Sequence, residues 1–176
     1  LNTNFISKNI FSFNIDKKFK IKNLVVNSDI QIDKSEYKNF SFLDNYLLEA
    51  KDLIYIKDHK IKISYKKNNF TAQGSGKVKL SNQFDEIKYS ITNTNNDFKL
   101  SSNILLSELK FRNRDFLKPF FPKLNDLINF KNQKIEINFD KKNLSIKGSG
   151  KIKLEKDFDE INYYISKKEN QFNFDT

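Results

Sequence analysis

The segment 70–80 has the sequence Phe-Thr-Ala-Gln-Gly-Ser-Gly-Lys-Val-Lys-Leu, in which apolar or small residues alternate with polar ones. An alternation with a period of two is typical of a β-strand that buries one face. The same pattern returns 74 residues later, at 144–154, as Leu-Ser-Ile-Lys-Gly-Ser-Gly-Lys-Ile-Lys-Leu. The sequence therefore predicts a strand that belongs to an internal repeat.

The repeat extends beyond this strand at the same offset. Pairing 60–100 with 134–174 gives 19 identities in 41 positions, which is far above chance. Further upstream, Leu24–Val26 resembles Ile104–Leu106 with about six residues inserted. We expect a partial unit with a crossing segment at 1–58, a complete unit at 59–132 and the start of a third at 133–176. Because the chain contains no methionine, we also expect it to be a fragment of a longer protein.

Each unit predicts several strands joined by short polar links. The links at 66–69, 81–83 and 92–97 are rich in Asn, Asp and Ser, which favour turns. Short links between consecutive strands indicate hairpins, hence an antiparallel meander with one apolar and one polar face. Leu109 and Phe111 suggest a short fifth strand. The expected fold class is mostly β: meander repeats that form a curled, open β-groove.

Between the meanders, Asp44–Leu53 and its counterpart Phe116–Ile128 have a different pattern. Leucines at helical spacing in the first copy predict a short helix, and Pro119 and Pro122 limit any helix in the second. We expect these short helical segments to cross the apolar face.

The candidate functional residues are the inward-facing positions of the predicted strands, which would line an apolar groove. They are Ile61, Ile63, Tyr65, Phe70, Ala72, Gly74, Gly76, Val78, Leu80, Ile87, Tyr89, Ile91, Ile135, Ile137, Phe139, Leu144, Ile146, Gly148, Gly150, Ile152, Leu154, Ile161, Tyr163 and Ile165.

All four glycines of the chain, Gly74, Gly76, Gly148 and Gly150, occupy apolar-face positions inside these strands. Glycine weakens a strand, so its presence indicates a bend, a bulge or a close approach to the backbone. One interpretation is a curling sheet in which glycine relieves crowding on the concave side. The other is a gap that leaves room for a ligand chain. A phosphate-binding loop is excluded, because the preceding glycine and following hydroxyl of that motif are missing.

Residues for catalysis or metal binding are sparse. The chain has no cysteine, and its single histidine, His59, is replaced by Gln133 in the second copy. We expect His59 to be a surface residue in a polar turn. Asp85 and Glu86 recur as an acidic pair, but neighbours in a strand point to opposite faces, so we expect them only to solvate the start of a strand. The sequence thus predicts no enzyme, no cofactor and no metal site.

The net charge of +10 comes from 32 basic and 22 acidic residues. Only Arg112 and Arg114 are arginine, the residue that nucleic-acid sites favour, and the remaining basic residues are lysine. The aromatic residues share the apolar face rather than lying among the lysines. We therefore expect no nucleic-acid partner.

These features resemble the AsmA-like family of repeating β-groove proteins, with YhdP-type central regions most similar. The resemblance rests on Phe70–Leu80 and its copy Leu144–Leu154, on Phe84–Tyr89, and on Phe116–Pro122. It implies about five strands and a crossing loop per unit, stacked into a long trough. It also implies a periplasmic protein, anchored in the inner membrane, that carries phospholipids or other acyl-chain lipids to the outer membrane. Neighbouring repeats of the same chain would continue the trough.

Two other functions fit the same sequence. A structural β-repeat, such as an adhesin-like envelope protein, would fill its interior with its own side chains. A basic nucleic-acid-binding module would use the lysine-rich face instead.

Overall fold

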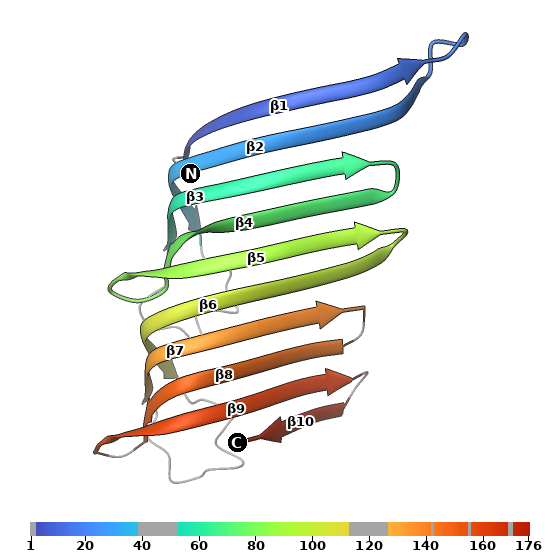
Figure 1. Ribbon diagram of the computed structural model, residues 1–176. Coiled ribbons are helices and arrows are strands. Elements are labelled where there is room, and N and C mark those ends of the chain that lie inside the picture. The colour runs from blue at the N-terminus through green and yellow to red at the C-terminus, as the bar shows by residue number, and fades with distance from the viewer. Residues whose placement is uncertain (1–2, 39–52, 113–126, 142, 155, 169–170) are drawn as a thin grey trace.

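The computed structural model describes residues 3–38, 53–112, 127–141, 143–154, 156–168 and 171–176. These residues form a single antiparallel sheet in which every strand pairs with its neighbours in chain order (Figure 1). The sheet is open, since β1 and β10 are its two edges. The strands are β1 (Thr3–Ile15), β2 (Ile21–Lys38), β3 (Leu53–Lys66), β4 (Asn69–Lys79), β5 (Phe84–Thr94), β6 (Asp97–Arg112), β7 (Leu127–Asp140), β8 (Asn143–Lys153), β9 (Phe158–Lys168) and β10 (Gln171–Asp175).

The predicted curled, open meander is confirmed, and no helix occurs within the ranges just given. Most of the two expected helical crossing segments, Asp44–Leu53 and Phe116–Ile128, lies outside the described residues. Where those segments end, the expectation is wrong. Leu53 begins β3 and Leu127 begins β7, so both are strand residues.

The pairing register shows a repeat of four strands, from β3 to β6, after which β7 takes the place of β3. The expected five strands per unit are therefore wrong. Leu109 and Phe111 do not form a separate strand, because they lie near the end of the long strand β6. The unit boundaries at 58/59 and 132/133 fall inside β3 and β7, so the units are parts of one continuous sheet.

The register also corrects the upstream alignment. Val26 pairs with Tyr65 as Leu100 pairs with Phe139, so β2 and β6 keep the offset of 74 residues. Phe11 pairs with Val26 and Ile91 with Leu100, so β1 is offset from β5 by 91 − 11 = 80 residues. The six additional residues therefore lie in the β1–β2 hairpin and not ahead of β3.

The long strands bend at one end, where the sheet turns away from its main plane (Figure 1). The pairing of β3 with β4 shifts between Lys57 and Lys60, and that of β7 with β8 between Lys131 and Lys134. Asp58 and Asn132 occupy these shifts with positive φ angles of 51°. Each shift is a β-bulge, which adds one residue to a strand and increases its local bend.

The most buried apolar side chains lie mainly along this bend. Ile32, Val78, Leu106, Ile128 and Ile152 are each less than a tenth exposed. Elsewhere the sheet stays open. The chain exposes 12860 Å², whereas a compact monomer of this mass would expose about 9,000 Å². Within the described residues, one sheet forms a single layer, without the second layer that a globular domain would supply.

Candidate functional site

One side of the sheet carries a nearly continuous row of apolar residues, which we call the apolar face. The register connects Ile61 of β3 to Gly74 and Tyr89, then through Ser102 to Ile137 of β7. The same row continues from Ile137 through β8 and β9 to β10. Because paired residues of neighbouring strands share a face, the predicted groove residues of both copies are brought together on this side.

The predicted groove residues remain partly accessible. Ala72, Gly74, Val78, Gly148 and Ile152 are buried, and all the others are half-buried except Tyr65, which is 37 % exposed. Half-burial differs from the full burial of a packed core, where side chains contact neighbours on every side.

The sequence prediction omitted apolar-face residues of β2 and β6. Ile30 pairs with Ile61, and Ile104 pairs with both Ile87 and Ile135. In β6 the period of two is obscured by Ser102 at an apolar-face position and by Leu105 on the opposite face, whereas in β2 Ile30 and Ile32 alternate with polar residues.

Gly74 and Gly148 make room for tyrosine rings. A Cβ atom at Gly74 would overlap the ring of Tyr89, and one at Gly148 would overlap the ring of Tyr163. Burial raises the pKa of both phenols. Each ring therefore lies against a glycine in the neighbouring strand.

Gly76 and Gly150 make room for the bulges. A Cβ at Gly76 would lie 2.7 Å from the Cα of His59, and one at Gly150 would lie 2.8 Å from the carbonyl oxygen of Asn132. The interpretation of the glycines as relief for a curling, crowded sheet is confirmed. The second interpretation, a gap kept for a ligand chain, is compatible with the first and stays a prediction, although side chains and backbone of the protein lie next to each glycine.

His59 is not a surface residue in a turn, as the sequence suggested. It lies within β3, is only 5 % exposed, and its Nε2 lies 3.1 Å from the hydroxyl of Tyr89. Burial lowers the pKa of the imidazole. In the second copy Gln133 takes this place and donates to the carbonyl oxygens of Lys131 and Lys151, at 3.2 and 2.9 Å. The sequence could have indicated this burial, since His59 lies two residues before Ile61 and therefore points to the same face of the strand.

Asp85 is also buried, with 2 % exposure, so its expected role as a solvated entrance to a strand is wrong. Its Oδ1 accepts hydrogen bonds from the backbone N and the Oγ of Ser107, both at 2.8 Å. Glu86 is exposed, as expected for the opposite face. Asp85 thus satisfies a backbone donor of β6 near the bend.

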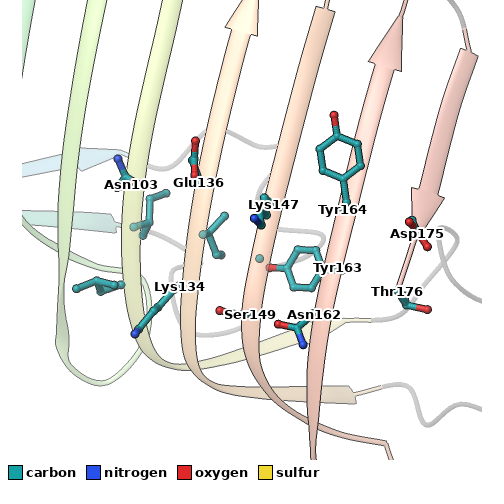
Figure 2. Close-up of a pocket in the computed structure, with 14 residues that line it drawn as sticks. Asn103, Lys134, Glu136, Lys147, Ser149, Asn162, Tyr163, Tyr164, Asp175 and Thr176 are labelled. Carbon is teal, nitrogen blue, oxygen red and sulfur yellow. The ribbon is translucent and has the colours of Figure 1, made fainter.

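The polar face carries shallow hollows. Figure 2 shows one of about 730 Å³, lined by Lys134, Glu136, Lys147 and Asn162 among others. The charges around it are mixed, since Asp175 also contributes. Two further hollows of about 490 and 540 Å³ lie over the same face and include Lys60, Lys62, Lys88, Lys99 and Lys168.

Within the described ranges, no three His, Cys, Asp or Glu side chains gather to hold a metal ion. Among the same residues there is also no helix long and apolar enough to cross a membrane. The arrangement can bury apolar ligands by contact along the apolar face.

Comparisons of this chain with protein-family models, with curated proteins and with solved structures find no match.

Proposed function

We propose that this chain is a segment of a bridge-like lipid-transfer protein, and that its apolar face holds the acyl chains of phospholipids while they move along the sheet. The resemblance to AsmA-like proteins supports a periplasmic location and transfer between the inner and outer membranes.

The observation that carries this proposal is the half-exposed apolar row that crosses the sheet from Ile30 to Phe174. Exposed apolar patches larger than a few hundred Å² usually mark a binding site. The exposed area of the chain exceeds that of a compact monomer by about 3,900 Å², as expected for a sheet that is not packed into a globular core.

The energetics suit transfer without a catalytic residue. Each CH₂ group that leaves water for an apolar surface contributes about 0.8 kcal/mol. Because the isoleucines recur along the row at similar positions, an acyl chain would meet similar contacts at each step. Movement along the sheet would then exchange one set of contacts for an equivalent one.

The direct test is to purify the chain from cells and measure bound phospholipid by native mass spectrometry and lipid extraction. Neighbouring residues of β8 supply matched variants, since Ile146 belongs to the apolar face and Lys147 to the polar face. We expect Ile146→Asp to lose most bound phospholipid and Lys147→Asp to keep it. Absence of phospholipid from the unaltered chain, or equal retention by both variants, would contradict the proposal.

The structural β-repeat remains the second candidate, because one observation favours it. Tyr89 and Tyr163 fill the space beside two of the glycines, and His59 and Gln133 fill the space beside the other two. If this filling extended over the whole face, the purified chain would carry no lipid. A hydrophobic dye such as ANS would then show little fluorescence with the folded chain.

A further inference from the structure

The β1–β2 hairpin differs from the other hairpins of the sheet. It is six residues longer than the corresponding β5–β6 hairpin, as the pairing register shows. In Figure 1 its tip projects beyond the neighbouring hairpins. The corresponding β5–β6 hairpin turns within two residues, Asn95 and Asn96. The other hairpins of the sheet show that the repeat does not require this extension.

A single carboxylate organises the tip. Asp16 Oδ1 accepts hydrogen bonds from the backbone N of Lys18 at 2.8 Å and of Lys20 at 3.0 Å. Its Oδ2 forms an ion pair with Lys22 at 3.1 Å. Backbone bonds between Asp16 and Phe19 (2.9 Å) and between Asp16 and Lys20 (3.1 Å) close the turn. The tip is therefore a built turn with a defined shape.

Phe19 lies at the end of this turn, and both its backbone conformation and its exposure to solvent are unfavourable. Its φ angle is 56°, and its side chain is 90 % exposed. The other non-glycine residues with positive φ are Asn, Asp or Lys, and a bulky aromatic residue rarely adopts this conformation. Because burial does not offset the strain or the exposure, Phe19 has the character of a contact residue.

The surroundings of Phe19 combine apolar and basic residues. Ile15 and Ile21 face each other across the hairpin and are 59 % and 60 % exposed, and Phe13 is 47 % exposed. Residues 16–22 contain four lysines and one acidic residue, a net charge of +3. Aromatic and aliphatic side chains next to lysines are the chemistry of proteins that insert shallowly into anionic lipid surfaces.

We propose that the β1–β2 hairpin docks on an anionic membrane surface, with Phe19 inserted among the lipids and the surrounding lysines paired with lipid phosphates. Charge complementarity favours this occupant over a protein partner, because three lysines, Lys17, Lys18 and Lys20, flank one aromatic anchor in the sequence, while Lys22 pairs with Asp16. The inference is independent of the proposed function, since docking requires no lipid on the apolar face.

The chain contains no tryptophan, so Phe19→Trp places a single fluorescent reporter at the tip. Vesicles of phosphatidylcholine and phosphatidylglycerol at 7:3 serve as the probe, and vesicles of pure phosphatidylcholine as the comparison. We expect a blue shift of emission with the anionic vesicles and quenching by brominated acyl chains. Asn96→Trp is the matched control at the short hairpin and should show neither effect.

Two further variants separate insertion from charge. Replacing Lys17, Lys18 and Lys20 with Gln should weaken binding to the anionic vesicles by about 100-fold. Phe19→Ser should weaken it by about tenfold, while leaving any phospholipid that co-purifies with the chain unchanged. Lack of a blue shift in Phe19→Trp, or an equal shift in Asn96→Trp, would overturn the proposal. A concentration-dependent blue shift without vesicles would also overturn it, in favour of a protein contact.

Discussion

Each Gly-Ser-Gly triplet contains two glycines with different neighbours. The first lies under a tyrosine ring, which can rotate away, and the second lies against the backbone of the bulge, which cannot. The same added methyl group should therefore have different effects at the two positions.

We expect Gly76→Ala to lower the free energy of unfolding by about 1–3 kcal/mol, because it forces the bulge at His59 to move. Gly150→Ala should lower the free energy of unfolding by a similar amount, because the new methyl group would crowd the carbonyl oxygen of Asn132. Urea titration followed by circular dichroism measures both effects. Wild-type stability in these two variants would show that the close approach at the bulge does not exist in solution.

Gly74→Ala provides a contrasting experiment. Alone it should destabilise the chain, because the new methyl group overlaps the ring of Tyr89. In a Tyr89→Ser background the overlap is gone, and the higher strand stability of alanine should make the same change neutral or stabilising. A double-mutant cycle measures this coupling, and additive effects would contradict the packing of ring on glycine.

His59 should make stability depend on pH. Burial lowers the pKa of its imidazole in the folded chain below the unfolded value of 6.5, so the unfolded chain binds more protons as the pH falls. Stability should therefore decrease as the pH falls below 6.5 and level off below the folded pKa. Denaturation midpoints measured between pH 8 and pH 5 test this.

The second copy suggests the control for this titration. Gln133 occupies the equivalent position without a titrating group. His59→Gln should therefore reduce the loss of stability between pH 7 and pH 5, and an unchanged pH dependence would assign the effect to other groups.

At the scale of the elements, the antiparallel meander and its curl followed from the sequence, but the positions of the bulges did not. The strand predicted here included only Ile61, Ile63 and Tyr65, whereas β3 begins at Leu53 and changes phase on the way. Ile54 and Ile56 precede Asp58 in one phase, and His59 and Ile61 follow it in the other. This change of phase marks the bulge, so it could have been found from the sequence.

The sequence also predicted that two polar residues would be exposed, although the structure buries them. His59 and Asp85 are polar in type, and their burial depends on partners from other strands, namely Tyr89 and Ser107. Such partners are brought together by the register, which a single sequence does not show. The helical crossing segments fall outside the described residues and stay predictions.

The link between β5 and β6 near the bend depends on Asp85. Asp85→Ala should lower the free energy of unfolding by about 2–4 kcal/mol, because it leaves the backbone N–H and the hydroxyl of Ser107 without their acceptor. Asp159, its counterpart 74 residues on, is exposed. Asp159→Ala should change stability by less than about 0.5 kcal/mol. Equal losses in the two variants, measured by urea titration, would contradict this assignment.

For the whole molecule, the open sheet predicts a weak response to denaturant. An unfolded chain of 20.9 kDa exposes about 30,300 Å², so unfolding from 12860 Å² releases about 17,400 Å². A compact protein of the same mass would release about 21,300 Å². We therefore expect the urea m-value of the lipid-free chain to lie about a fifth below that of a compact protein of this length.

Bound lipid should change this value in a predictable direction. Acyl chains that cover the apolar face leave it on unfolding, so the m-value should rise when the chain is saturated with phospholipid. A lipid-free m-value already at the compact level would mean that the apolar face is covered in solution, and dilution would show whether self-association covers it.

The bulges at Asp58 and Asn132 lie at the same place in successive units, so the bends of β3 and β7 form a common crease. Each unit adds four strands, which extends the sheet by about 19 Å in the direction of strand pairing. The cross-section stays the same from one unit to the next. The reach of such a protein is therefore set by the copy number of its units, and gene duplication can lengthen it in fixed steps without any new packing solution.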